Sequence, residues 1–222
     1  MRNLFNLSTV LFVLILLGGC IKENEDNSKP IIQVLGSNPH YMRLNTPYRD
    51  TGVLVMDNYG VLKIWSDITS LDTSHAGRYT IKYFAMDFSE NLAEASRTVV
   101  VRIEGFNLRS QWSVEKTEPF PGGQINSFND SLFNPTVKKI YFAGLTSPLL
   151  QPIRADIIGS LGDTLAISKQ LILTSDTLIS YMLGLGIIQS DAQRFEVLYH
   201  RINERPGTVD TIVGKMIYSK LK

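Results

Sequence analysis

The sequence predicts an all-β protein built from two β-rich modules, and three observations support this. Short apolar runs recur from residue 31 onward, separated by Gly, Pro, Asn and Asp turn residues. Within the runs, apolar residues repeat at every second position, which is the period of a strand with one buried face. No stretch of useful helical length interrupts residues 31–104. We expect an antiparallel β-sandwich over residues 31–104 and a second antiparallel β-domain, either a small barrel or a sandwich, over residues 106–222.

The first 19 residues have the pattern of a secretory signal peptide. Arg2 supplies a positive charge, and residues 10–17 are an unbroken apolar run. This run is shorter than the roughly 20 residues that a transmembrane helix needs. It ends in Leu17-Gly18-Gly19-Cys20, which contains the only cysteine of the chain. A buried helix that ends in a free cysteine is the alternative, but the polar residues that follow at once argue against it.

These residues resemble the lipobox of bacterial lipoproteins. Small residues before the cysteine suit a narrow protease groove, and the thiol offers a nucleophilic sulfur for a thioether. The resemblance implies cleavage after residue 19 and attachment of lipid, including acyl chains such as palmitate, to Cys20. The mature chain would then have 222 minus 19, or 203, residues. Its length suits one large domain or two small ones.

Residues 20–30 are predicted to be a lipid-anchored tether. The segment is polar, lacks periodicity and ends at Pro30. Its acidic residues, Glu23, Glu25 and Asp26, follow Lys22 and resemble the export signal of Bacteroidota-type lipoproteins. That resemblance implies an outer-membrane location with the protein facing the cell surface. The alternative is an ordinary solvated linker.

Charge and cysteine content exclude two classes of partner or site. The net charge is +1, and 22 basic residues are interspersed with 21 acidic ones. A nucleic-acid partner would require a basic patch or stripe, so we expect none. A lipidated Cys20 leaves no thiol for a disulfide or for a thiolate metal site.

Each short apolar run in the two modules is expected to form one strand. In the first module, residues 78–85 alternate cleanly and place Tyr79, Ile81 and Tyr83 on one face. The expected strands there are residues 31–36, 41–44, 52–56, 61–65, 78–85 and 95–103. In the second module, Trp112 is expected in the core with Val114, and Gly184-Leu185-Gly186 is expected to turn before the strand around Phe195. The expected strands there are residues 111–115, 137–142, 153–158, 164–168, 170–173, 195–200 and 211–218.

The first module resembles the bacterial surface immunoglobulin-like (Ig-like) domain over about residues 29–104. Six blocks in the family order carry the resemblance: residues 30–32, 48–53, 56–58, 72–80, 83–87 and 91–93. It implies an Ig-like β-sandwich of the kind found in surface lipoproteins and adhesins. The chain departs from the family at Tyr59-Gly60-Val61, where a Gly-Asp pair is usual, and this argues against a metal there. The sequence pattern of the second module is similar to that of the β-domains of unknown function that accompany such Ig-like units.

The sequence predicts no catalytic residue, no cofactor and no metal, and we expect no enzyme; a hydrolase with two carboxylates facing each other across a cleft is the third alternative. It contains no Gly-x-Ser-x-Gly elbow, His-Glu-x-x-His pair or phosphate loop. Asp57, Asp87, Glu90 and Asn91 could gather at one end of a sandwich and bind calcium. We favour the simpler role of these side chains, which is to cap their own turns by accepting hydrogen bonds from backbone amides.

Aromatic residues are the candidate ligand contacts. Tyr59 and Trp65, with Tyr48 nearby, could form a platform on which sugar rings stack, and core packing is the alternative. The predicted function is a non-enzymatic binding or adhesion module for a glycan or a surface protein. In that view the Ig-like unit is a spacer and the second domain makes the contact. A structural subunit that pairs through an exposed edge strand is the alternative function.

Overall fold

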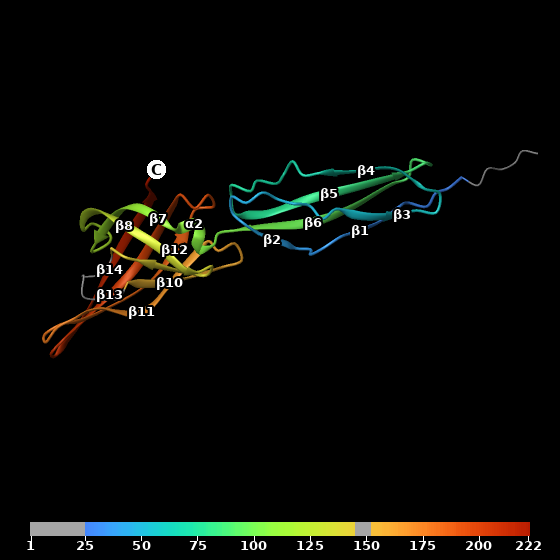
Figure 1. Cartoon of the computed structure of the whole chain (residues 1–222). Coiled ribbons are helices and arrows are strands. Elements are labelled where there is room, and N and C mark those ends of the chain that lie inside the picture. Colours follow the sequence, from blue (N-terminus) through green and yellow to red (C-terminus); the bar gives the residue numbers. More distant parts are fainter. Residues whose placement is uncertain (1–24, 145–151) are drawn as a thin grey trace, which may run out of the picture.

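The computed structural model describes residues 25–144 and 152–222. The expected signal peptide and Cys20 lie outside these residues. Figure 1 shows two β modules arranged end to end, with residues 25–30 at the end of the first module that lies away from the second. In the part of the chain that the structure describes, no helix combines the length and apolar character needed to cross a membrane.

The first module is the expected β-sandwich. A two-stranded sheet packs against a four-stranded sheet of order β2-β6-β5-β4. Most neighbours are antiparallel, but β2 runs parallel to β6, which the sequence did not indicate. The smaller sheet contains β1 (Ile31–Val34) and β3 (Val53–Met56), and the larger contains β2 (His40–Arg43), β4 (Val61–Asp67), β5 (Gly77–Asp87) and β6 (Leu92–Arg102).

The second module is a closed barrel, which settles the alternative that the sequence left open. Its eight strands follow the order β10-β11-β12-β13-β14-β7-β8-β9, and β9 pairs with β10 to close the ring. The strands are β7 (Ser110–Glu118), β8 (Gln124–Thr136), β9 (Lys139–Phe142), β10 (Ile153–Ile158), β11 (Thr164–Thr174), β12 (Ile179–Ile188), β13 (Arg194–Arg205) and β14 (Thr208–Lys220). A closed ring leaves no free sheet edge in this module.

Two expectations for the second module were wrong. Gly184-Leu185-Gly186 is not a turn but lies inside β12, where each residue pairs with β13. A Cβ atom on Gly184 would lie 2.6 Å from the carbonyl oxygen of Leu198, so glycine permits a close approach of the two strands. Residues 164–168 and 170–173 are one strand, β11, whose register shifts between Ile167 and Gln170.

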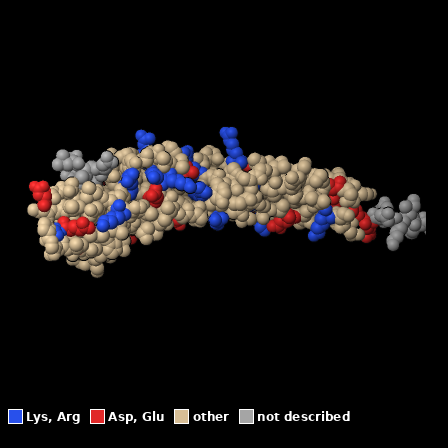
Figure 2. All heavy atoms as spheres, turned by 90° about the horizontal axis from the view of Figure 1, so that it is seen from below, with Lys and Arg blue, Asp and Glu red and all other residues tan. Residues whose placement is uncertain are grey.

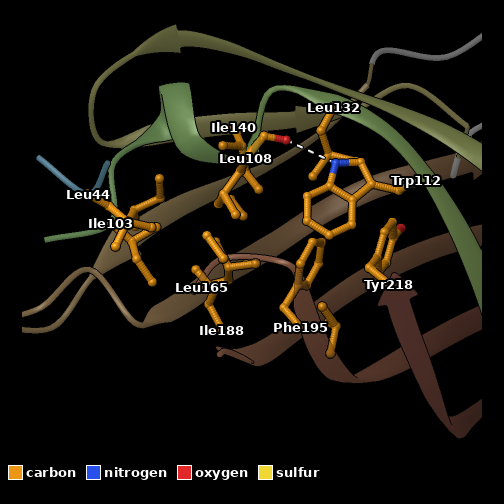
Figure 3. Close-up of a cluster of buried hydrophobic side chains, with 14 of the residues drawn as sticks. Leu44, Ile103, Leu108, Trp112, Leu132, Ile140, Leu165, Ile188, Phe195 and Tyr218 are labelled. Carbon is orange, nitrogen blue, oxygen red and sulfur yellow. Dashed lines mark hydrogen bonds between the residues drawn. The ribbon is translucent and has the colours of Figure 1, made fainter. Parts of the chain in front are cut away.

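Aromatic and aliphatic side chains fill the barrel, and Figure 3 shows part of this core. Trp112 is fully buried, which confirms its predicted place in the core. Its ring packs edge-on against Phe195 at a centroid distance of 4.9 Å, and Phe195 stacks on Tyr218 at 4.4 Å. The indole N–H of Trp112 donates to the carbonyl oxygen of Leu108 at 3.0 Å, so its one polar group is satisfied inside the core.

The short helix α2 (Gly105–Leu108) joins the two modules, and the core continues through this junction. Leu44 and Ile103 from the sandwich and Leu108 from α2 belong to the same buried cluster as the barrel residues. Main-chain hydrogen bonds cross the junction: the amide of Ile103 donates to Leu161 at 2.8 Å, and the amide of Ala76 donates to Ser190 at 2.7 Å. We infer that the modules are held in one orientation.

Gly162 provides a test of this junction. Its φ is +69°, and a Cβ atom there would lie 2.0 Å from the carbonyl oxygen of Ile103. We expect Gly162→Ala to lower the free energy of unfolding by more than the roughly 1–3 kcal/mol of backbone strain alone. Gly207→Ala is the matched control, because Gly207 has a φ of +79° and nothing within 4 Å of an added Cβ. Urea unfolding measures both; equal losses would contradict a tightly packed junction.

Candidate functional site

A cleft of about 580 Å³ lies where the two modules meet. The end of the sandwich, the turn between β8 and β9 and the end of β10 form its walls. Two hydrogen bonds hold this turn in place: the amide of Gly105 donates to Val137 at 2.8 Å, and the amide of Ile157 donates to Lys138 at 2.7 Å. The cleft has the size of an ordinary ligand pocket and lies at a domain boundary, where such pockets are common.

The cleft contains both signs of charge, with one more basic residue than acidic. Arg102, Lys138 and Lys139 line it together with Glu104 and Asp156. Lys139 Nζ lies 3.7 Å from Asp156 Oδ1, and both side chains are about half exposed, so this pair contributes little stability. The guanidinium carbon of Arg102 lies 4.8 Å from the centre of the Tyr41 ring, a cation–π contact that orients the side chain. On the face seen in Figure 2, basic side chains gather near the middle of the molecule, with acidic ones among them.

Asp57 and Asp87 cap their turns at the opposite end of the sandwich, as expected. Asp57 Oδ1 accepts hydrogen bonds from the amides of Tyr59 at 2.8 Å and Gly60 at 2.9 Å. Asp87 Oδ1 accepts from the amides of Ser89 and Asn91, each at 2.8 Å. The turn between β3 and β4 and the turn between β5 and β6 are therefore each fixed by one carboxylate oxygen.

The structure brings a third carboxylate to this place, one that the sequence did not single out. Ligand atoms of Asp26, Asp57 and Asp87 lie within 4.8 Å of one another. Asp26 is held there because Asn91 Nδ2 donates to its carbonyl oxygen at 2.8 Å and Asn58 Nδ2 donates to its carboxylate at 3.2 Å. This part of the predicted tether is therefore docked on the sandwich. Glu90, expected nearby, is not in the group.

These three carboxylates could each give one oxygen to a cation. Hydrogen bonds from the Ser28 amide and the Asn58 side chain lower the pKa of Asp26, so its carboxylate is charged at neutral pH. The Oδ2 atoms of Asp26 and Asp57 are shielded from solvent and accept no hydrogen bond. Calcium takes about six to eight oxygens, of which three side chains supply only part. The expectation that no metal binds stays a prediction.

Mutation of Asp57 tests that prediction. Because three carboxylates repel one another, we expect Asp57→Asn to raise the stability by about 0.5 kcal/mol in chelator at low salt, and we expect salt to reduce the gain. Asp67→Asn is the control, since Asp67 caps a turn outside the cluster by accepting from Thr69. Thermal unfolding reads out both variants. If Ca²⁺ raises the Tm of the wild type but not of Asp57→Asn, the chain binds a metal there.

Tyr48 belongs to a polar network around a buried arginine rather than to an aromatic platform. Arg97 is fully buried, and its Nη1 donates to Asp50 at 2.8 Å and to the Tyr48 hydroxyl at 3.1 Å. The Tyr83 hydroxyl also donates to Asp50, at 2.8 Å. Burial opposes ionisation of Asp50, but the hydrogen bonds from Gly52, Tyr83 and Tyr48 and the charge of Arg97 together lower its pKa. The network explains why Tyr48 and Asp50 occupy one of the blocks that resemble the Ig-like family.

The two predicted ligand residues lie close in sequence, one in a turn and one in the strand that follows it, but apart from each other. Tyr59 is 64% exposed in the turn between β3 and β4. Trp65 lies four residues beyond Val61 along β4, a strand distance of about 13 Å. Its ring stacks on Phe84 at a centroid distance of 5.2 Å, and Lys63 Nζ lies 5.1 Å from its centre. A ligand role for either residue stays a prediction.

Comparison with known proteins identifies the first module. Residues 32–101 match a family model described as a bacterial surface protein, Ig-like domain. A crystal structure of a lipoprotein from Bacteroides thetaiotaomicron is similar at 12% sequence identity, covering 86% of this chain and 100% of that one, with a TM-score of 0.29. A TM-score this low does not establish a common fold. No curated protein matches the chain.

Proposed function

We propose that this chain, whose residues 32–101 form a bacterial surface Ig-like domain, is a lipid-anchored binding protein of the outer membrane. In this proposal Cys20 carries the lipid, the protein faces outward, and it binds its ligand without catalysis. The Ig-like domain supports a location at the cell surface. The leader and the lipobox sequence support the anchor.

The cleft at the domain junction is the observation that best supports a binding role. It has the volume of a small-molecule pocket and is lined by residues of both modules. Three basic residues face two acidic ones there, and Lys139 and Asp156 form a pair. Lys138 and Arg102 are therefore available to an acidic group of a ligand. We propose a glycan with a carboxylate or sulfate as the ligand class.

A glycan array probed with residues 24–222 tests this function. We expect saturable binding to acidic glycans and a loss of affinity of about tenfold or more in Lys138→Ala, because a charge-assisted hydrogen bond contributes roughly 1.5–3 kcal/mol. Lys29→Ala is the matched control, because Lys29 is an exposed lysine at the other end of the sandwich. Binding that instead depends on Trp65 or Tyr59 would move the site to the first module.

Assembly through a sheet edge is the second candidate function. Within residues 25–144 and 152–222, strand β4 pairs with β5 alone, so its other edge is free of partners there, and Leu62 and Ile64 on it are each 51% exposed. An open edge with exposed apolar residues is a template for a strand of another molecule. If no glycan binds and the chain self-associates, we expect Ile64→Lys to abolish the association in sedimentation experiments. A monomer at all concentrations would argue against assembly.

A further inference from the structure

The end of the sandwich that lies away from the barrel presents apolar side chains to solvent. Five of them, which we call the tip, come from the start of β1, the end of β3, the two adjoining turns and the start of β6: Ile31, Met56, Tyr59, Phe88 and Leu92. Each is between 43% and 65% exposed. Ile31 pairs directly with Met56, and the amide of Phe88 donates to Gly60 beside Tyr59 at 3.3 Å, so the tip is assembled from neighbouring segments.

The incoming chain is fastened to this same end. Asn58 and Asn91 hold Asp26, as described above, and Pro30 is buried. Only five positions separate Glu25 from Cys20. Five extended residues span at most about 18 Å. With lipid on Cys20, the backbone of Glu25 therefore lies within about 18 Å of the lipidated residue, and Asp26 next to it is docked at the tip end of the sandwich.

We propose that the tip rests on the lipid surface of the membrane that holds the anchor, with Tyr59 and Phe88 at the level of the head groups. This inference depends on the proposed anchor at Cys20. Aromatic side chains are favoured at a membrane–water interface, and exposed apolar clusters commonly mark contact surfaces. The tether supplies a high local concentration of lipid, so a weak contact is sufficient.

The charges around the tip favour zwitterionic lipid over anionic lipid. Asp87 is fully buried, and its carboxylate is directed into its turn. Glu25 and Glu90 are exposed at the rim, and so is Lys29. At this end of the face shown in Figure 2, acidic side chains lie with a basic one among them. These carboxylates would be attracted to the ammonium groups of phosphatidylethanolamine and repelled by an anionic surface.

Spin labelling of the anchored protein tests the proposal. Because lipid blocks Cys20, the cysteine of the variant Phe88→Cys is the one thiol that can react with a nitroxide label. The labelled mature protein is placed in phosphatidylethanolamine–phosphatidylcholine vesicles. We expect this label to be several-fold more accessible to oxygen, relative to a water-soluble nickel complex, than a label at Val209→Cys. Val209 is the control because it is 69% exposed and lies at the start of β14, at the far end of the barrel. A label at Met56→Cys gives a second reading from the tip.

The outcomes separate the contact from the anchor. Mass spectrometry of the amino-terminal peptide first shows whether Cys20 carries lipid. If Cys20 carries no lipid, residues 21–222 are attached to nickel-chelating lipid through an amino-terminal histidine tag. Each variant then has one cysteine, at position 88, 56 or 209, and the same accessibilities are measured. Oxygen accessibility at positions 88 and 56 equal to that at 209 overturns the proposal in either arrangement. Elevated accessibility at 88 and 56 supports the contact, whatever the natural anchor.

Discussion

The packed junction between the sandwich and the barrel is the constraint on which the arrangement of this protein depends. Strand β6 leads through α2 into β7 without a linker, and Leu44, Ile103 and Leu108 extend one hydrophobic core across the boundary. If the connection were flexible, the walls of the cleft would not keep a fixed position relative to each other. Because main-chain hydrogen bonds also cross the junction, the cleft residues from both modules keep one relative position.

Each module is stabilised in a different way on its side of the junction. The sandwich contains a fully buried guanidinium, Arg97, which is paired with Asp50 and sits beneath Tyr48 and Tyr83. Removing one partner of such a pair is far more costly than its net contribution suggests. The barrel instead relies on stacked aromatic rings around Phe195 and on closure of its sheet. The proposed contacts with a membrane and with a ligand lie at opposite ends of the sandwich.

Local alternation predicted much of the fold, but contacts between distant segments decided the rest. The period of two in residues 78–85 and the burial of Trp112 were readable from the sequence, and the structure confirms both. Arg97 lies on the buried face of β6 in step with Val99 and Val101, and a charged residue within such an apolar alternation is the local signal of a buried ion pair. No local sequence pattern indicates the position of Asp26, because the side-chain amides of Asn58 and Asn91, which lie far along the chain, hold it in place. Barrel closure likewise depends on pairing between β9 and β10, which no local pattern encodes.

The two modules form one body with a permanent cleft between them. Pulsed electron–electron spin resonance between one nitroxide on the outer face of the sandwich and one on the outer face of the barrel tests it most directly. The exposed positions Thr80 and Leu198 suit these labels. We expect a single narrow distance distribution that does not change with salt. A broad distribution would show that the modules move independently, and the cleft could not then be a preformed site.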